Sequence, residues 1–552
     1  MRSPPPQFDA GFVIRLRDAV AAQLPALLPE QRWFGAKARQ IQSVSLADYI
    51  VIPLPQADSL ITLVRVEYTG GGGETYVLPL LMSEQDSAST ELSSCMVRIP
   101  TSNSSPEVLL VNALGDNSFL SVILDSIRGA LSFAGWQGEI NARPAARLQE
   151  IYPSSAATSR PRHLKAEQSN TSIAYDDRLI LKFFRRIEEG VNPELEISRF
   201  LTEVAHFANT PPLCGSLEYL TRDGKNFVLG ILQEFVPNRG DAWQFTTESL
   251  TDLLVRSVVS VGADIPSAEQ RSSTSTLVGD AAAREPADQL SKQLEFVDLL
   301  GRRTAEFHLA LDSSPSNPAF AREPFTPEVR EALESSLHDL AVRNFDLLRK
   351  RSEQLPQPLR ELAAKVLEVE HDVLLAFHVG LENDLRSVRT RIHGDYHLGQ
   401  VLFTGSDFFI IDFEGEPARP ASERRAKRSP LQDVAGMLRS FHYAARSALL
   451  SAREKLGTSI SLDAKPGLLA KRWQTLATRH FLQSYRKAAT GAPFLPADPS
   501  EFDALLRIHL LEKAIYELGY ELNNRPEWLA IPLEGIETLL AKNPVESEMT
   551  LE

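Results

Sequence analysis

The chain has 552 residues, of which 43% are hydrophobic and 24% are charged, and its net charge is −14 at pH 7. This length exceeds what one hydrophobic core usually serves, so we expect several structural units in a globular protein. The negative charge disfavours binding to nucleic acid, because it repels phosphate backbones.

Localisation is predicted from the cysteines and from the N-terminal residues. Two cysteines, Cys95 and Cys214, are few for a secreted protein of this size. The first residues, "MRSPPPQFDAGFVIRLRDAV", contain no apolar signal segment. No run of about 18 apolar residues could span a membrane. We therefore predict a cytoplasmic protein without a membrane or nucleic-acid partner.

The N-terminal region is expected to be one helix laid on an antiparallel sheet. Apolar residues recur at helical spacing over residues 10–30, and "QRWFGAKAR" follows. The segments "ADYIVIPL" and "LITLVRVEYT" are typical of strands, and four glycines at 70–73 mark a hairpin. We assign residues 1–105 to an N-terminal cap module.

A second strand-rich region follows, with a helix behind it. The stretch "RHLKAEQSNTSIAYDDRLILKFFRR" predicts strands separated by polar turns. The next helix is expected to begin at Asn192, a good N-cap, with Pro193 at its first position. We assign residues 106–240 to a small, nucleotide-binding lobe.

Helices are expected to dominate the C-terminal half. Residues 265–292, rich in Ser, Ala, Glu and Asp, lack aliphatic periodicity and predict a mobile surface loop. The predicted helices beyond this loop cover residues 293–312, 327–350, 358–383, 430–452, 465–489, 500–523 and 532–542. We assign 241–552 to a mainly helical lobe, which makes the chain an α+β protein with two lobes and an extra cap.

The stretch "RIHGDYHLGQVLFTGSDFFIIDFEGEP" interrupts the helices and carries the strongest chemical signal. Its spacing matches the kinase pattern H-R-D-x-x-x-x-N followed by D-F-G, with Asp395, Gln400 and Asp412 at the functional positions. Phosphoryl transfer needs a carboxylate at the acceptor hydroxyl and oxygen ligands for Mg²⁺. We assign these roles to Asp395 and to the pair Gln400 and Asp412. The alternative is a surface hairpin with solvated acids.

A kinase-like small lobe also needs a lysine near a strand end and a glutamate in the next helix. Lys182 ends "LILK", and Glu194 and Glu196 open the following helix. We favour Glu196, because Phe200 one turn later lies on the buried stripe. The alternative for Lys182 is an exposed lysine at the end of a strand.

The phosphate-covering turn contains no glycine-rich loop. "EQSNTS" takes its place, and its N–H groups and hydroxyls could hold phosphate oxygens, unless it is a decorated turn without function. The residues predicted for the nucleotide site, besides the lysine and the two glutamates, are Gln168, Ser169, Asn170, Thr171, Ser172 and Glu234.

The stretch "LLEKAIYELGYELNNRPEWLAIPLEGI" predicts a sugar subsite. It places acids, amides and tyrosines on one helical face, where aromatic rings can stack on a sugar. The alternative is an amphipathic packing helix. The predicted substrate-binding residues are His393, His397, Glu414, Lys513, Tyr516, Glu517, Tyr520, Asn524, Arg525 and Trp528.

Two residues outside these motifs are expected to be structural. Asp433 lies in the first turn of a predicted helix and could brace the loop that carries Asp395. His308 lies on an apolar helical face and is expected to be a core histidine.

Together these motifs resemble the bacterial maltokinases, relatives of the aminoglycoside and choline phosphotransferases. The segments that carry the resemblance include "QRWFGAKAR", "EQSNTSI", "HGDYHLGQVL", "IDFEGEPARP" and "YELGYELNNRPEWLAIPLEGI". The resemblance implies a bilobal protein-kinase-like fold with an N-terminal cap. It also implies that ATP and Mg²⁺ support phosphorylation of the anomeric hydroxyl of maltose, which feeds α-glucan synthesis.

The resemblance assigns roles to residues as well. Asp395 would be the catalytic base, Gln400 and Asp412 the Mg²⁺ ligands, and Lys182 a contact to the phosphates of ATP. Some relatives are fused to trehalose synthase, so that enzyme is a conceivable partner. Two alternatives remain: a kinase of the same fold for another small sugar or aminoalcohol, and a non-catalytic subunit of a trehalose-converting complex.

Overall fold

The computed structural model describes residues 9–55, 58–83, 95–100, 107–152, 160–164, 170–262, 276–382, 385–416, 419–457 and 465–541. The chain divides into two compact units. Unit 1 comprises Met1–Thr202 and Pro211–Pro237, and unit 2 comprises Glu203–Thr210 and Asn238–Glu552.

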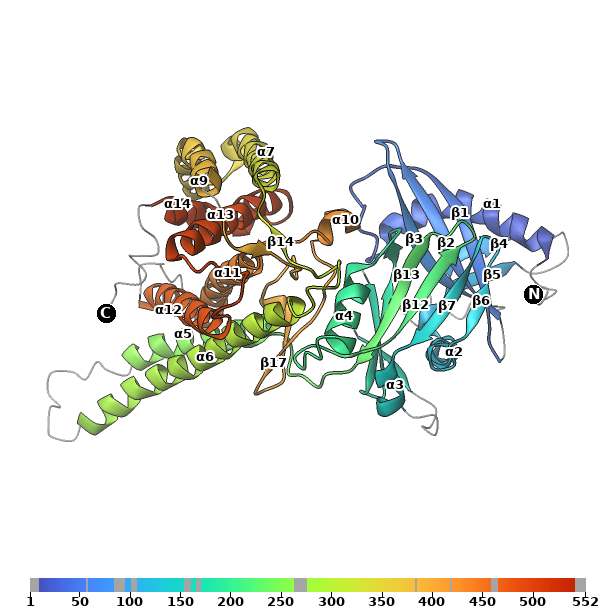
Figure 1. The fold of residues 1–552 in the computed structure, drawn as a ribbon, viewed down its shortest axis with the longest axis horizontal. Helices are drawn as coiled ribbons and strands as arrows, with labels where there is room; N and C mark the ends of the chain where they lie inside the picture. Colours follow the sequence, from blue (N-terminus) through green and yellow to red (C-terminus); the bar gives the residue numbers. More distant parts are fainter. Residues whose placement is uncertain are drawn as a thin grey trace. The chain divides into compact units, whose positions relative to one another are not determined.

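The first sheet of unit 1 belongs to the predicted cap. Helix α1 (Ala10–Leu27) lies along one face of this sheet, and Phe12, Leu16 and Val20 join its core (Figure 1). The strands are antiparallel in the order β1-β2-β3-β5-β4, and β11 pairs with β3. Their bounds are β1 (Ile41–Pro53), β2 (Asp58–Tyr68), β3 (Gly73–Ser83), β4 (Cys95–Ile99), β5 (Val108–Asn112) and β11 (Arg186–Ile187), and the 3₁₀ helix η2 (Leu28–Glu30) follows α1. The expected helix on an antiparallel sheet is therefore present.

The second sheet of unit 1 has seven strands in the order β6-β7-β12-β13-β10-β9-β8. Their bounds are β6 (Ser132–Ala134), β7 (Gly138–Pro144), β8 (Pro161–His163), β9 (Asn170–Tyr175), β10 (Leu179–Phe184), β12 (Leu213–Thr221) and β13 (Asn226–Glu234). The helical elements of this part are η3 (Ala113–Gly115), α2 (Asn117–Arg128), α3 (Ala146–Ile151) and α4 (Pro193–Glu203). Aliphatic and aromatic side chains from α2, β10, β12 and β13 form its core.

The two sheets of unit 1 are physically joined. Strand β10 continues through Arg185 into β11, where Arg186 pairs with Tyr76 of β3. The predicted cap boundary at residue 105 is too early, because β5 belongs to the cap sheet and residues 105–150 showed no clear pattern in the sequence. The further division of the chain into three domains stays a prediction.

A buried carboxylate of the cap fastens the second sheet. Asp48, which is 1% exposed, accepts a hydrogen bond of 2.6 Å from the Tyr219 hydroxyl. It also accepts the backbone N–H groups of Trp136 and Gln137 at 2.9 and 3.0 Å. A buried carboxylate needs several donors, and here the donors come from β12 and from the turn between β6 and β7.

Unit 2 is mainly helical, as predicted (Figure 1). Its α-helices are α5 (Ala242–Gly262), α6 (Thr276–Leu311), α7 (Pro327–Arg351), α8 (Gln357–Glu368), α9 (Glu370–Glu382), α10 (Ala421–Arg424), α11 (Leu431–Leu456), α12 (Lys465–Ala488), α13 (Pro499–Asn524) and α14 (Ala530–Leu540). Its short elements are β14 (Glu323–Pro324), η4 (Ser352–Gln354), β15 (Val388–Arg389), η5 (Leu398–Gln400), β16 (Val401–Phe403), β17 (Phe408–Ile410) and η6 (Pro526–Trp528). The predicted hairpin is the antiparallel pair β16–β17.

Two predictions about these helices are wrong in part. Residues 276–292, expected to be part of a loop, form the start of α6. Their sequence "TLVGDAAAREPADQLSK" has no apolar stripe but contains many good helix formers, and propensity prevails here. Residues 358–383 form two helices, because the chain leaves helical geometry at Val369.

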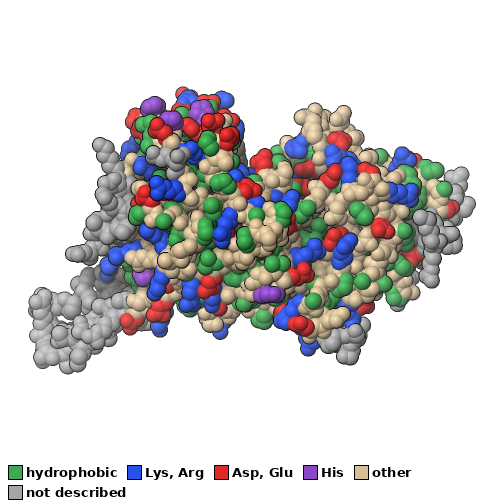
Figure 2. Space-filling model, viewed as in Figure 1, with side chains coloured by type: hydrophobic (Ala, Val, Ile, Leu, Met, Phe, Trp, Pro, Cys, Tyr) green, Lys and Arg blue, Asp and Glu red, His purple; other side chains and the backbone are tan. Residues whose placement is uncertain are grey.

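The exposed faces of α7 and α9 carry charged side chains and histidines (Figure 2). Among them, His378 of α9 contacts Glu334 of α7 at 2.8 Å. Such solvated polar faces are expected of helices at the surface. Of the helices that the structure describes, none is long and apolar enough to cross a bilayer.

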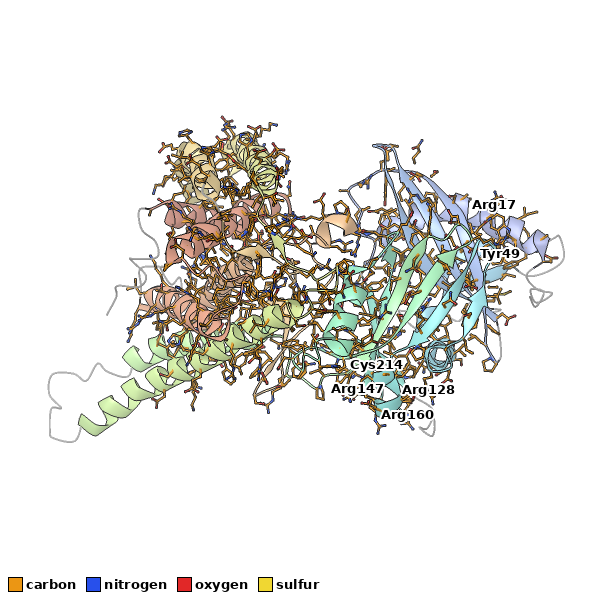
Figure 3. The ribbon with its side chains drawn as sticks, in the orientation of Figure 1. Arg17, Tyr49, Arg128, Arg147, Arg160 and Cys214 are labelled. Atoms are coloured by element: carbon orange, nitrogen blue, oxygen red, sulfur yellow. The ribbon has the colours of Figure 1, made fainter. Side chains whose placement is uncertain are left out.

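The junction in unit 1 can be tested by changing Tyr219 to Phe. This exchange removes one donor from buried Asp48, so the free energy of unfolding should fall by about 1.5–3 kcal/mol in denaturant titrations. Tyr49→Phe is a matched control on the neighbouring residue, which is labelled in Figure 3 and is half-buried. It should change the free energy by less than about 0.5 kcal/mol. If both exchanges lowered the free energy of unfolding equally, the hydrogen bond from Tyr219 to Asp48 would make no specific contribution to stability.

Candidate functional site

Lys182 is held in unit 1 by the strand pair β9–β10. The hairpin turns at residues 176–178, where Asp176 and Asp177 have left-handed φ angles of 53° and 51° and the N–H of Arg178 donates to the Tyr175 carbonyl at 3.0 Å. The resulting register places Lys182 opposite Ser172, so both side chains lie on the same face of the sheet. Lys182 is buried, and its Nζ lies 3.7 Å from Oε2 of Glu194.

Glu194 comes from the start of α4. The Asn192 side chain accepts the N–H of Leu195 at 3.0 Å, which confirms the predicted N-cap. Glu194 is 1% exposed, whereas Glu196 is half-buried. Our preference for Glu196 as the partner of Lys182 was wrong, because residues two apart in a helix point in different directions. The lysine–glutamate pair itself is present, with Glu194 as the glutamate.

The predicted phosphate-covering turn is described only in part. Gln168 and Ser169 lie outside the described residues, and Asn170, Thr171 and Ser172 belong to β9 rather than to a turn. The Ser172 hydroxyl is buried and has no hydrogen-bond partner among the described residues. Thr171 faces away from Lys182, and its Oγ1 accepts a hydrogen bond of 3.0 Å from Nε of Arg185. Ser172 is thus the hydroxyl that shares the face of Lys182.

Glu234 serves a different contact from the one predicted. At the end of β13, its Oε2 accepts hydrogen bonds from Nε and Nη2 of Arg147 at 3.1 and 3.0 Å. Arg147 lies in α3, near Cys214 of β12 (Figure 3). The Glu234 side chain therefore fixes α3 to the sheet, which explains its position without a nucleotide.

In unit 2, the loop that carries Asp395 is fixed by Asp433. The N–H groups of His393 and Gly394 donate to the two oxygens of Asp433 at 2.7 and 2.9 Å. Gly394 has a φ of +85°, which a side chain would strain. His308 Nε2 contacts the same carboxylate at 3.1 Å, and its Nδ1 contacts the Tyr485 hydroxyl at 2.9 Å. The bracing role of Asp433 and the burial of His308 are confirmed, although His308 also takes part in this network.

Close packing of α11 supports the same loop. At Gly436 a Cβ atom would come within 2.5 Å of the Tyr396 carbonyl oxygen, so only glycine lets the helix approach this closely. The Tyr396 hydroxyl meets Thr304 of α6 at 2.9 Å. The backbone on both sides of Asp395 is therefore held by contacts to α6 and α11.

Asp395 lies in a cavity, opposite a lysine. Nζ of Lys513 donates to Oδ1 of Asp395 at 3.3 Å. Burial would raise the pKa of Asp395, but Lys513, His397 and His393 outweigh it and lower the pKa below its usual value. The same pair raises the pKa of Lys513, although burial alone would lower it. Asp395 is consequently an ionised, acceptor-only carboxylate, as a base must be.

The predicted metal ligands lie at one end of the β16–β17 hairpin. Val401 pairs with Ile410, and the Gln400 carbonyl accepts the N–H of Ile411 at 3.0 Å, so Gln400, which precedes β16, and Asp412, which follows β17, lie at the same end of the hairpin. Asp412 has a left-handed φ of 67°, an uncommon conformation that is often found at functional sites. Their side chains offer oxygens, the donor type that Mg²⁺ prefers. The donor set therefore fits the predicted ion.

Two of the predicted substrate-binding residues are engaged with the backbone. His393 is 1% exposed, and its Nε2 donates to the Ile411 carbonyl at 2.9 Å, which ties the loop to the hairpin. His397 Nδ1 accepts the N–H of Gly399 at 3.0 Å. Burial lowers the pKa of His397 despite the nearby Asp395. These contacts contradict a direct substrate role for His393 and indicate a neutral ring for His397.

Helix α13 supplies part of the cavity wall. Lys513 and Tyr516 line the cavity, and the ring of Tyr520 lies 6.4 Å from that of Tyr516 at an angle of 21°. Glu517 points elsewhere, because its Oε2 accepts two hydrogen bonds from Arg439 at 2.9 and 2.6 Å. Glu517 is therefore a structural partner of α11, and its prediction as a sugar ligand was wrong.

The remaining predicted residues of the C-terminal stretch lie next to Tyr520. The Arg525 guanidinium is 5.2 Å from the Tyr520 ring and 5.6 Å from the Trp528 ring. Trp528 also stacks on Tyr443 at 6.1 Å. Asn524 donates to the Tyr520 carbonyl at 2.9 Å. These residues form an aromatic and cationic surface beside Tyr520, and the structure does not place them in the wall of the cavity.

Four charged or titratable residues of the cavity wall were not predicted. The carboxyl group of Glu416 pairs with Arg419 at 2.6 Å, and Glu512 contacts His509 at 2.9 Å and Arg419 at 3.6 Å. All four line the same cavity as Asp395, whereas Glu414 does not. A helical stripe of 509, 513, 516 and 520 was visible in the sequence, so His509 could have been found. Glu416 and Arg419 lie beside Glu414 in "DFEGEPAR", where sequence alone does not show which acid points inward.

The assignment of Glu194 can be tested by comparing two neighbouring glutamates. Glu194→Gln removes the charge that orients buried Lys182, so ATP affinity measured by titration calorimetry should fall by about tenfold or more. Glu196→Gln is the matched control and should change affinity by less than about threefold. A larger loss of ATP affinity in Glu196→Gln than in Glu194→Gln would instead identify Glu196 as the partner of Lys182.

Two regions of the chain match known protein families. Residues 27–116 match the maltokinase N-terminal cap domain, and residues 162–458 match the phosphotransferase enzyme family. A glucosamine kinase of Streptacidiphilus jiangxiensis is 22% identical over 400 residues, which are 72% of this chain and 77% of the relative. A glucosamine kinase of Mycolicibacterium smegmatis is 25% identical over 382 residues, 69% of this chain and 79% of the relative.

The fold is shared with a solved structure as well. A glucosamine kinase in complex with glucosamine, ADP and inorganic phosphate superposes with a TM-score of 0.58 at 18% identity, covering 95% of this chain and 99% of that one. The kinase-like fold with an N-terminal cap is thereby confirmed. The phosphotransferase match covers more than half of the chain and spans Lys182, Asp395 and Asp412. The chain therefore belongs to the phosphotransferase enzyme family.

Proposed function

We propose that this phosphotransferase is a maltose 1-kinase, which transfers the γ-phosphate of ATP to the anomeric hydroxyl of maltose. The observation that carries the proposal is the ionised Asp395 carboxylate in a cavity bordered by Lys513 and Tyr516. An ionised carboxylate accepts the proton of an attacking hydroxyl, and a fixed lysine beside it can orient the sugar. The maltokinase-type cap supports maltose as the acceptor.

ATP binding is assigned to Lys182, positioned by Glu194, with Ser172 on the same face. Gln400 and Asp412 would hold Mg²⁺, which neutralises charge on the phosphates when it is bound. These residues bind and orient the phosphates, while Asp395 accepts the proton of the sugar hydroxyl. Family membership implies ATP, and Mg²⁺ is proposed from the donor set.

A neutral sugar suits the charges of the cavity better than an amino sugar does. Glucosamine kinase relatives make glucosamine the second candidate. An ammonium group needs a carboxylate to receive it, but Asp395, Glu416 and Glu512 each already have a cationic partner. His509 also donates from Nδ1 to Glu512, which gives that carboxylate a further partner.

The metabolic role of the reaction is proposed from the resemblance to the maltokinases. Maltose 1-phosphate would be consumed by an enzyme of α-glucan synthesis, and trehalose synthase would supply maltose in the cytoplasm. A complex with trehalose synthase is part of this proposal, but the reaction itself requires no second protein.

Substrate choice is tested with purified protein, ATP and Mg²⁺. We expect phosphorylation of maltose, with a product whose phosphorus signal couples to the anomeric proton in nuclear magnetic resonance spectra. Glucosamine should react with a kcat/KM at least about a hundredfold lower, because an uncompensated ammonium costs about 3 kcal/mol in this cavity. A higher kcat/KM for glucosamine, or a phosphate on another hydroxyl, would overturn the assignment to maltose.

The pH dependence tests how Lys513 acts on Asp395. Turnover is lost as pH falls through the pKa of Asp395, which Lys513 keeps low. In Lys513→Met, burial dominates and the pKa of Asp395 rises, so the acid limb of the kcat profile should move to higher pH by about 1–3 pH units. Lys513→Arg keeps the charge and should retain the acid limb of the wild type. An unchanged limb in Lys513→Met would exclude Asp395 as the titrating base.

A further inference from the structure

Arg185 is a buried cation at the joint between the two sheets of unit 1. It is 2% exposed and follows β10, and its carbonyl accepts the N–H of Val77 from β3 at 2.8 Å. Burial lowers the pKa of Arg185 to about 9, and no carboxylate of the described residues offsets this effect. Burying a guanidinium is costly unless its contacts offset the loss of hydration, so the contacts that Arg185 does make bear on its role.

The contacts of Arg185 connect the cap with the strand pair that carries Lys182. Its guanidinium lies 5.1 Å from the ring of Trp33, which belongs to the cap segment "QRWFGAKAR". Its Nε donates to Thr171 Oγ1 of β9, while its buried Nη1 has no hydrogen-bond partner among the residues that the structure describes. Trp33 itself lies 5.9 Å from Tyr76 of β3. The Arg185 guanidinium thus contacts both Trp33 of the cap and Thr171 of β9.

We propose that Arg185 is a positioning residue through which the cap controls the nucleotide-binding strand β9. Thr171 precedes Ser172, which faces Lys182 across the strand pair, so a shift at Thr171 changes the spacing of the predicted phosphate contacts. The cap then serves the nucleotide half of the reaction and leaves sugar recognition to unit 2. This inference rests on the proposed role of Lys182 and Ser172 in ATP binding.

Arg186 offers a matched control on the adjacent residue. It also links the strand to the cap, with Nη1 3.1 Å from Glu74 and Nη2 3.3 Å from Glu188. These two contacts are to carboxylates, whereas Arg185 contacts Trp33 and Thr171. Loss of Arg186 therefore weakens the same junction and leaves the hydrogen bond from Arg185 to Thr171 of β9 in place.

The test is the affinity for ADP, measured by titration calorimetry in the absence of any sugar. Arg185→Met should weaken ADP binding by about three- to thirtyfold, and Thr171→Val and Trp33→Leu should weaken it in the same direction. Combining Trp33→Leu with Arg185→Met should add little to the effect of Arg185→Met alone, because both act through one contact. Arg185→Lys should recover part of the affinity, and Arg186→Met should stay within about twofold of the wild type.

Two outcomes would overturn the proposed role of Arg185. If ADP affinity in Arg185→Met stays within about twofold of the wild type, Arg185 has no positioning role. If Arg186→Met weakens ADP binding as much as Arg185→Met, the effect is general destabilisation of the junction, and the inference fails. If Arg185→Met does not melt cooperatively, Thr171→Val gives the answer. Since no sugar is present, a failure of maltose phosphorylation leaves this test intact.

Discussion

The acceptor site depends on one buried carboxylate, that of Asp433. Both of its oxygens accept backbone N–H groups, and His308 contacts one of them as well. This clamp sets the left-handed backbone at Gly394 and thereby directs Asp395 into the cavity. A loop held by side-chain oxygens from a helix start is more rigid than a loop held by its own turn, and such rigidity is what positioning of a base requires.

The second main feature of the structure is the pairing of buried lysines with carboxylates. Lys182 pairs with Glu194 in unit 1, and Lys513 pairs with Asp395 in unit 2, each largely removed from water. Buried pairs give little net stability, but each holds its ammonium in place, and Lys513 lowers the pKa of Asp395 and keeps that carboxylate ionised. In the cavity that contains Asp395, the carboxylates of Glu416 and Glu512 also have a cationic partner, Arg419. Carboxylates that already have cationic partners favour a neutral sugar, although the relatives are named glucosamine kinases.

Sequence reasoning went furthest where chemistry and local spacing coincide. The N-cap at Asn192, the β16–β17 hairpin and the brace at Asp433 all follow from local patterns and are present. Errors arose where direction is set by tertiary packing. Lys182 pairs with Glu194 rather than Glu196, and Glu517 pairs with Arg439. Glu416, and not Glu414, lines the cavity. The sequence shows which acidic residues a segment contains, but not the direction in which each side chain points. Strand β5 and the start of α6 lacked clear periodicity and were missed.

The most direct test of the account is the rate of Asp395→Asn with ATP and maltose, combined with equilibrium binding of both. The exchange keeps the shape of the side chain but removes the proton acceptor. We expect kcat to fall by about 10²- to 10⁴-fold, while both affinities change by less than about tenfold. A kcat within about threefold of the wild type would contradict the account, because Asp395 would then be a solvated acid at the edge of a hairpin rather than the base.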